Sequence, residues 1–505
     1  MPQAVDKVIV THRGALRAKY GAAYAARVVP AIAALVAADR TRGLVTRVVH
    51  LDAKTEMRKL DAPPVTTAGS RRQHKAAIDG VFAALRPAYL CLLGAVDVIP
   101  HQDLANPLAS DGDPVAWSDL PYACDAGYAK RIDAFLAPTR VVGRLPDVTG
   151  ATAPDDLVAA LGFAANATSR PAGDYDAYLA LTAKVWSAST AQSVTQVFGN
   201  ASDVQAIPPQ SPPWPALARR AHFINCHGAT ADPHFYGQQG ASYPVAHDAA
   251  LLAGLAEGTV ASVECCYGAE LYDPALAGGA AGICHAYLRQ GAHAFFGSST
   301  IAYGPASGNG QADLICQYFL REVRAGASTG EAALKARQAF VRQLAIADPA
   351  DLKTLAQFML LGDPSLHPVA ASPHAADMLA APSPKAATRD AAGARAASRG
   401  MRRAHLAALG EAVARTVAVA AGRERTPPRT RTLLEAELAQ AGARCVDVAA
   451  FAVRPPRAAK ARAATARVAV AVGELPQAAA PFPRLCVVIA RETPAGVVVR
   501  RLYSR

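Results

Sequence analysis

The sequence contains few charged residues, few aromatic residues and no long unbroken apolar run. Of its 505 residues, 51% are hydrophobic, 18% charged and 6% aromatic, so the chain can bury a large core but is too long for one compact domain. The longest apolar stretch, Ala22 to Ala38, is interrupted by Arg27 and Pro30, which argues against a membrane span. The first residues lack a basic segment followed by an apolar one, so we expect no signal peptide.

The sequence also lacks a cysteine pattern typical of disulfide bonds and a phosphate-binding loop. Nine cysteines are an odd number, scattered along the chain and mostly inside apolar segments, which indicates reduced thiols rather than a disulfide framework. We therefore expect a soluble cytoplasmic enzyme of bacterial type. Because no glycine-rich loop follows a strand in the pattern that binds phosphates, a nucleotide-binding α/β protein is disfavoured, and we expect no cofactor.

The first part of the chain alternates between strand and helix patterns. Apolar runs predict strands, and segments of helical periodicity predict helices between them. The strands are expected at 8–10, 46–51 and 89–93, and the helices at 25–39 and 71–85. This order predicts a doubly wound α/β subdomain over residues 1–170. Within it, residues 101–137 form a long loop region of the kind that is often functional.

A second α/β subdomain is expected over residues 171–369. It begins with a strand near Tyr178 to Val185 and continues through alternating elements. The expected strands include 259–265 and 292–296, and the expected helices include 246–255, 279–288 and segments after Gln311 and Thr329. Residues 1–369 together predict a catalytic unit of two subdomains.

Two apolar runs of this subdomain each end in a reactive side chain. One run ends in Asn225-Cys226-His227-Gly228, and the other, about forty residues later, ends in Glu264-Cys265-Cys266. Each run fits a buried strand of a parallel sheet, and ligands bind beyond the carboxyl ends of such strands. Neighbouring strands would therefore bring an imidazole and a thiol together, with the N–H groups of Gly228 and Cys266 as an oxyanion hole.

These residues also have structural or metal-binding interpretations. A single histidine or cysteine at a strand end is usually structural. A zinc site formed by Cys226, His227, Cys265 and Cys266 is disfavoured, because adjacent residues of a strand point to opposite faces. We therefore predict no metal at this site.

Further segments extend the pattern and carry a resemblance to a known family. They follow the His-Gly and Glu-Cys-Cys runs in the order of the caspase-like clan of cysteine peptidases, and the chain resembles the gingipain family most. These segments are Tyr89–Pro100, Ser118–Tyr122, Val141–Pro146, Ala294–Thr300 and Leu360–Leu366. The resemblance implies caspase-like doubly wound sheets in two subdomains and cysteine endopeptidase activity.

The resemblance also implies roles for individual residues. Cys266 matches the nucleophile, because it follows a small residue that itself follows an acid, and His227 matches the general acid/base. Family members often cut after basic residues, using an acidic group in the first specificity pocket and an aromatic lid. Asp119 and Tyr303 are the nearest matches to these two groups, which implies cleavage after Arg or Lys. Asp119 is equally well explained as a turn residue before Pro121.

The positive charge of the protein is concentrated at its end. From residue 370 onward there are 22 Lys and Arg against 9 Asp and Glu, while the preceding part has 30 against 31. An Ala-, Pro- and Ser-rich segment, 370–400, predicts a linker, and 401–505 predict a small basic α+β domain with helices near 404–421 and 432–441 and a terminal hairpin.

Two functions are compatible with this basic domain. As part of a peptidase acting on protein or peptide substrates, it can attract an acidic partner protein or nucleic acid. In the alternative, the caspase-like unit is catalytically inactive and the chain is a binding or scaffolding module that uses the basic domain. The presence of both His-Gly and Glu-Cys-Cys favours the enzyme.

Overall fold

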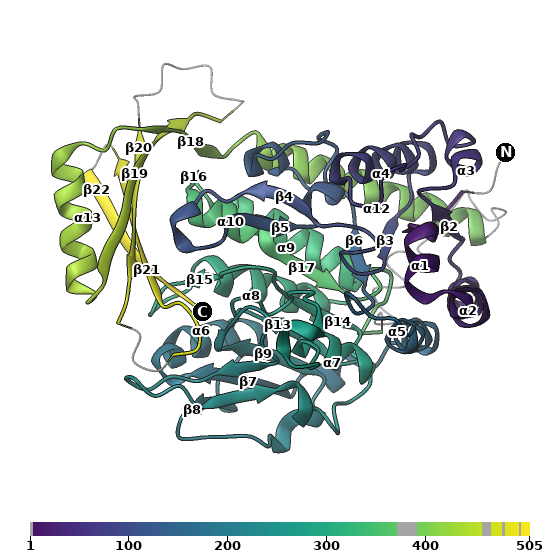
Figure 1. Cartoon of the computed structure of the whole chain (residues 1–505), viewed down its shortest axis with the longest axis horizontal. Coiled ribbons are helices and arrows are strands. Elements are labelled where there is room, and N and C mark those ends of the chain that lie inside the picture. The colour runs from purple at the N-terminus through teal and green to yellow at the C-terminus, as the bar shows by residue number, and fades with distance from the viewer. Residues whose placement is uncertain (1–3, 371–390, 457–465, 477–479, 494–495) are drawn as a thin grey trace, which may run out of the picture.

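The computed structural model describes residues 4–370, 391–456, 466–476, 480–493 and 496–505. One sheet of ten strands organises the catalytic unit (Figure 1). Its order is β2 (Thr46–His50), β1 (Lys7–Thr11), β3 (Tyr89–Leu93), β6 (Val142–Leu145), β17 (Phe358–Leu361), β14 (Ala294–Ser298), β13 (Val260–Val263), β9 (Ala221–Asn225), β7 (Tyr178–Ala183) and β8 (Val204–Ile207).

The sheet consists of two halves, and β17, from the second expected subdomain, belongs to the half formed by strands of the first. The strands from β2 to β17 are parallel to one another, and so are those from β14 to β8, but β14 and β17 pair antiparallel. The halves therefore run in opposite directions and share one continuous set of hydrogen bonds. The expectation of an α/β fold rich in parallel strands is confirmed, whereas the separate sheets of two subdomains are replaced by one.

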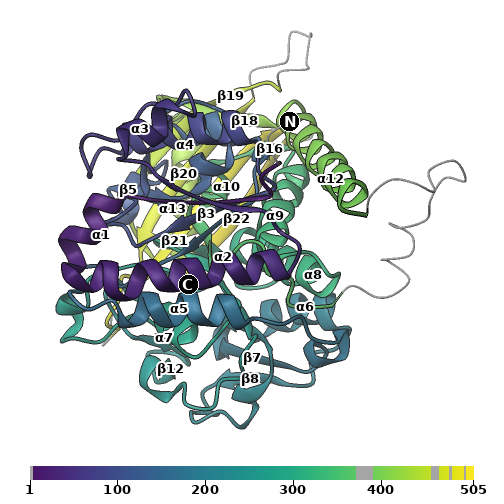
Figure 2. The same cartoon turned by 90° about the vertical axis from the view of Figure 1, so that its right-hand side faces the viewer.

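Helices cover both faces of the sheet, and Figure 2 shows two of them, α2 and α5, side by side. The Arg42 guanidinium fixes this pair by donating to the Ala164 carbonyl at 2.7 Å. The helices of the catalytic unit are α1 (Arg13–Tyr20), α2 (Val29–Thr41), α3 (Lys54–Arg58), α4 (Arg71–Leu85), α5 (Asp155–Asn166), α6 (Ser187–Phe198), α7 (Ile283–Arg289), α8 (Gln311–Arg324), α9 (Thr329–Gln343) and α10 (Pro349–Gln357).

Shorter strands of the catalytic unit lie outside the ten-stranded sheet. They are β4 (Gln102–Ala105), β5 (Val115–Ser118), β10 (His227–Gly228), β11 (His234–Tyr236), β12 (Val245–Asp248), β15 (Tyr303–Gly304) and β16 (Ile346–Ala347). The helix expected over 246–255 is wrong, because β12 pairs with β11 and only a short 3₁₀ turn, Ala249–Leu251, follows it.

The end of the chain forms a second sheet that includes strands of the catalytic unit. Its order is β15, β22 (Gly496–Ser504), β21 (Leu485–Thr493), β20 (Arg467–Glu474), β19 (Arg444–Arg454), β18 (Ala418–Glu424) and β16. Helix α13 (Pro428–Gln440) packs on it, and α12 (Ala391–Ala414) precedes it. Most of the expected linker lies outside the described residues, and its last part belongs to α12.

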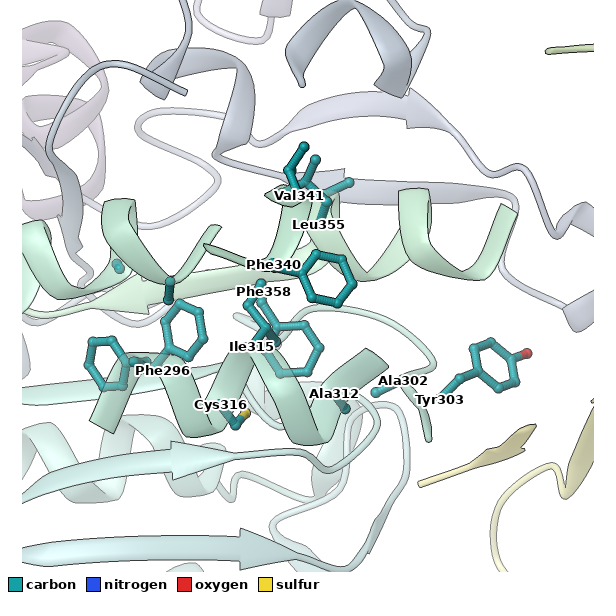
Figure 3. Packing of buried hydrophobic residues seen from close by; sticks show 14 of the residues in the cluster. Phe296, Ala302, Tyr303, Ala312, Ile315, Cys316, Phe340, Val341, Leu355 and Phe358 are labelled. Atoms are coloured by element: carbon teal, nitrogen blue, oxygen red, sulfur yellow. The ribbon is translucent and has the colours of Figure 1, made fainter. Parts of the chain in front are cut away.

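A single core joins the two sheets. Aromatic rings from β14, α9 and β17 pack with Ile315 of α8, and Tyr303 lies at the edge of this group (Figure 3). The same cluster of buried residues includes Val487 and Leu502 of the last two strands. The C-terminal domain is therefore packed against the catalytic unit rather than tethered beside it.

No single helix among the described residues has both the length and the apolar character needed to cross a membrane; only the sharply bent pair Arg13–Tyr20 and Tyr24–Thr41 passes that test when taken together.

Candidate active site

His227 and Cys266 follow two neighbouring strands and lie at the same position in the register of these strands. Strands β9 and β13 are parallel, and Ile224 lies opposite Val263. The register continues past the strands, because the Glu264 N–H donates to the Ile224 carbonyl at 2.8 Å. His227 comes three residues after Ile224, and Cys266 three residues after Val263. The structure therefore brings both residues to the same edge of the sheet.

The two adjacent thiols occupy opposite faces of the sheet. Cys265 packs in the apolar cluster that holds Ala261, Val263 and Cys226, whereas Cys266 belongs to the cluster on the other face. The alternation of β13 thus continues to its end. Among the described residues, no group of three or more His, Cys, Asp or Glu side chains is arranged to hold a metal ion.

The Cys266 thiol lies against the backbone of Ala302. Its Sγ accepts from the Ala302 N–H at 3.3 Å and lies 3.5 Å from the Ala302 carbonyl, to which the thiol donates. Burial is the main reason that the pKa of Cys266 is raised to about 12. In this form of the protein the thiol is therefore protonated.

Two backbone N–H groups converge on one oxygen atom beside this thiol. A backbone oxygen of Arg505 accepts from the Cys266 N–H at 3.0 Å and from the Gly228 N–H at 3.5 Å. A side chain at Gly228 would overlap the Cys266 carbonyl, so this approach requires glycine. The next residue, Tyr267, has a φ of 55°, a conformation that a side chain adopts only when its surroundings hold it there.

The His227 ring is oriented by Gln238. The Gln238 amide nitrogen donates to the Gly240 carbonyl at 3.1 Å and lies 3.3 Å from the Tyr243 hydroxyl. The amide oxygen therefore faces His227 Nε2, 2.8 Å away, and accepts a hydrogen bond from the Nε2–H. This assignment leaves Nδ1 with the lone pair, and Nδ1 has no hydrogen-bond partner among the described residues.

Aromatic rings enclose the imidazole. Its centroid lies 4.4 Å from the Trp186 ring and 4.6 Å from the Phe482 ring of the C-terminal domain. Burial is the largest cause of the lowered pKa of His227, about 3, and the charges of Arg484 and Arg505 act in the same direction. The ring is therefore neutral, and a cavity of about 180 Å³ lies beside it.

The Arg505 side chain fills a pocket next to these groups. Its Nη2 lies 3.1 Å from Asp313 Oδ1 and 2.9 Å from the Pro305 carbonyl, and its guanidinium lies 4.5 Å from the Trp186 ring. Glu264 is 4.0 Å from its Nε. A side chain at Gly304 would overlap the guanidinium, so the pocket has room for Arg505 only because residue 304 is glycine.

Two buried acidic side chains, Asp313 and Glu264, lie next to the positive charge of Arg505. Asp313 belongs to the first turn of α8, and both it and Glu264 are fully buried. Burial is the main cause that raises the pKa of Glu264 well above its usual range; the Asp313 charge adds to this effect and Arg505 opposes it. Burial therefore disfavours a second negative charge in this pocket, and a cation in the position of the Arg505 guanidinium offsets part of that cost.

The backbone before Arg505 pairs with the catalytic unit as an added strand. The Arg505 N–H donates to the Ala302 carbonyl at 3.0 Å, and β22 pairs antiparallel with β15, with Ser504 opposite Tyr303 and Tyr503 opposite Gly304. An extended peptide bound to a sheet edge in this way is a common mode of peptide recognition.

The structure gives Asp119 a different place from the one expected. Its carboxylate is engaged by Arg144, at 2.6 and 2.8 Å, and by His101 Nδ1 at 2.9 Å. Burial would raise the pKa of Asp119, but the charges of Arg144 and His101 outweigh it and lower the pKa. Both oxygens are thus occupied within the protein, so a contact between Asp119 and a substrate would require one of these bonds to break, and its place in a specificity pocket stays a prediction.

Tyr303 lies at the site, but through its backbone rather than as a lid. Its ring is fully buried, and its hydroxyl donates to Asp111 Oδ2 at 3.0 Å. Asp113 accepts from the Tyr267 hydroxyl at 2.7 Å, and Lys353 pairs with both aspartates. Through Asp111 and Asp113, the long loop 101–137 therefore holds Tyr303, which follows Ala302, and Tyr267, which follows Cys266.

Four residues of the site were not found from the sequence: Trp186, Gln238, Asp313 and Arg505. Asp313 reads as an ordinary acidic residue of a first helical turn, and its contact with Arg505 spans 192 positions. The strand pattern before Arg505 predicts an extended backbone there, but it does not predict the pocket that the Arg505 side chain fills.

Comparison of the sequence with known protein families gives the class of enzyme to which this chain is similar. Residues 239–369 match the model of Peptidase family C25, so the protein is a cysteine-type peptidase, a hydrolase. Family C25 is the gingipain family, and this part of the chain is gingipain-like. The match includes Cys266 and Asp313 but begins after His227. No curated protein matches the chain.

Proposed function

We propose that the protein is an endopeptidase in which Cys266 is the nucleophile, His227 the general acid/base, and the N–H groups of Gly228 and Cys266 the oxyanion hole. The observation that carries this proposal is the backbone oxygen of Arg505, which accepts from both N–H groups while the strand before it pairs with β15. A scissile carbonyl held in the same way would lie beside the Cys266 thiol.

The chemistry follows from the hydrogen bonds of His227. Since Nε2 donates to Gln238, Nδ1 is the nitrogen that can take the thiol proton. The thiolate sulfur then bonds to the scissile carbon, the oxyanion accepts from the two N–H groups, and Nδ1 returns the proton to the departing amine. Water, deprotonated by the same nitrogen, hydrolyses the thioester and restores the thiol.

We further propose that the enzyme cuts after arginine. The pocket beside Cys266 offers two buried carboxylates, the Pro305 carbonyl and the face of Trp186, each of which favours a guanidinium. Lysine could neither stack a planar group on Trp186 nor place a nitrogen at the position of Arg505 Nε, 4.0 Å from Glu264. Cleavage after Arg therefore rests on Asp313 and Glu264 rather than on Asp119.

Labelling of the full-length Arg505→Ala chain, whose cationic pocket is free for the probe, with a peptidyl-arginine electrophile tests the nucleophile. We expect a single adduct on Cys266, located by mass spectrometry, and no adduct in Cys266→Ala. The matched control is Cys265→Ala, which should still be labelled because Cys265 packs on the opposite face. An adduct on Cys265, or no adduct under conditions that label a reference cysteine peptidase, would contradict the proposal and favour the inactive scaffold.

A further inference from the structure

The C-terminal strand occupies the part of the site proposed for the residues before a scissile bond. Arg505 fills the cationic pocket, its backbone oxygen accepts from both N–H groups, and its N–H bonds to Ala302. Ser504 and Tyr503 pair with the short strand β15. Each interaction proposed for the residue before a scissile bond, and for the two residues preceding it, is thus made by the protein itself.

The occupied site is closed to solvent. The Arg505 side chain has no exposed surface, Cys266 is 3% exposed and His227 is 2% exposed. Phe482, which precedes β21, covers one face of the imidazole. A substrate can reach the thiol only if the end of β22 leaves.

The remainder of the C-terminal domain holds this strand in position. Arg491 of β21 and Arg500 of β22 both pair with Asp348 and Asp351 at the start of α10. Leu502 is buried in the core that the domain shares with the catalytic unit. Because the strand is attached and aligned, its effective concentration at the site is high, on the order of millimolar or more.

We propose that β22 is a built-in, substrate-like inhibitor, with Arg505 as its anchor, and that the described structure is the self-inhibited form of the peptidase. This inference rests on the proposed function, since it assigns the regulation of the same site. The neutral thiol and neutral imidazole agree with it, because solvent is excluded from both while the strand is in place.

Three full-length variants test the proposal. Arg505→Ala removes the anchor, and Arg505→Lys keeps a charge without the planar group. Arg501→Ala is the matched control, because Arg501 lies on the same strand but pairs with Glu437 and Gln440 away from the site. Thermal unfolding verifies that each variant is folded. Two rates are measured: alkylation of Cys266 by iodoacetamide, located by mass spectrometry, and hydrolysis of a short arginyl peptide.

We expect Arg505→Ala to raise both the alkylation rate and kcat/KM at least tenfold, mainly by lowering KM, because the strand and the substrate compete for one site. The alkylation rate and kcat/KM of Arg505→Lys should lie between those of the parent chain and Arg505→Ala. Both values for Arg501→Ala should equal those of the parent chain. Equal alkylation of Cys266 in all four proteins would overturn the inhibitor proposal, even if every one of them hydrolyses the peptide.

The two proposals fail differently. Faster alkylation of Cys266 in Arg505→Ala without hydrolysis would uphold the covering strand and contradict the peptidase mechanism. Binding of N-acetyl-arginine amide to Cys266→Ala proteins gives a readout free of catalysis. It should bind when Arg505 is also replaced and not when Arg505 is present; equal binding to both would reject Arg505 as the occupant of the pocket.

Discussion

Replacing Asp313 by asparagine separates recognition of a charged guanidinium from the rest of catalysis. Asp313 lies 3.1 and 3.2 Å from the Arg505 guanidinium through its two oxygens. Asparagine has nearly the same shape but no charge. To keep the pocket open, the substitution is made in the full-length Arg505→Ala chain, and a substrate arginine takes the place of Arg505.

The size of the effect follows from the contacts. A hydrogen bond to a charged group contributes about 1.5–3 kcal/mol, and removing one partner of a buried ion pair costs about 3–5 kcal/mol. Glu264 remains 4.0 Å from the guanidinium and retains part of the attraction, so we take about 3 kcal/mol. Since about 1.4 kcal/mol is a factor of ten, kcat/KM for an arginyl peptide should fall about 100-fold.

The assay compares two peptides that differ only at the cleaved residue, arginine and citrulline. Citrulline has nearly the same shape as arginine but is neutral, so Asp313→Asn should change its kcat/KM little. The control is Asp119→Asn, which should leave the arginine-to-citrulline ratio unchanged because Asp119 pairs with Arg144. Equal losses on both peptides with Asp313→Asn, or a loss of selectivity with Asp119→Asn, would refute the assignment of the pocket.

Three further outcomes are expected in the same Arg505→Ala chain or in comparison with it. Gln238→Ala should lower kcat about tenfold with little change in KM, since a buried hydrogen bond contributes about 1–1.5 kcal/mol, whereas Gln238→Glu should raise the apparent pKa of His227 in the kcat profile; unchanged profiles would exclude a positioning role. Gly304→Ala should raise KM for arginyl peptides far more than for peptides with alanine at the cleaved position, because its Cβ enters the pocket; equal effects on both would contradict this. Alkylation of Cys266 in the parent chain should show no inflection below pH 10, because burial raises the pKa of the thiol to about 12, and thiolate appears only as pH rises toward that value. Arg505→Ala should move the inflection to lower pH, and an unchanged alkylation profile would count against the shielding.

Local sequence patterns predicted most strands of the ten-stranded sheet and most of its helices. They failed where pairing between segments that are distant in the sequence determines the structure. Helix α4 and strand β3 have the predicted bounds, 71–85 and 89–93. The union of the two halves could not be predicted, because β17 joins them from residues 358–361 by pairing with β6 on one side and β14 on the other. The helix expected to reach Ala421 stops at Ala414, because β18 begins at Ala418 and pairs with β16 and β19.

Strand-end residues were easier to predict than the pocket. His227 and Cys266 were predicted because an apolar run followed by a reactive side chain points beyond the end of a strand, a rule that needs no distant contact. The structure brings both residues to one edge of the sheet, and their catalytic roles stay a prediction. The pocket depends on a contact between α8 and the end of the chain, which no local periodicity encodes. Asp119 was chosen by resemblance, and its buried pairing with Arg144 depends on the packing of the long loop against β6.

The charge of the C-terminal domain has a different meaning once the fold is known. As a sequence, its excess of arginine favours an external acidic partner or nucleic acid. In the structure, part of that charge is directed at the catalytic unit, where Arg491 and Arg500 meet Asp348 and Asp351, and Arg454 pairs with Asp133. Arg491 and Arg500 are only 20% and 31% exposed, so an external polyanion would have to replace contacts that hold β21 and β22. The same arginines that suggest a partner are therefore among the contacts that keep Arg505 in the active site, and a ligand that captured them would also loosen the strand that blocks it.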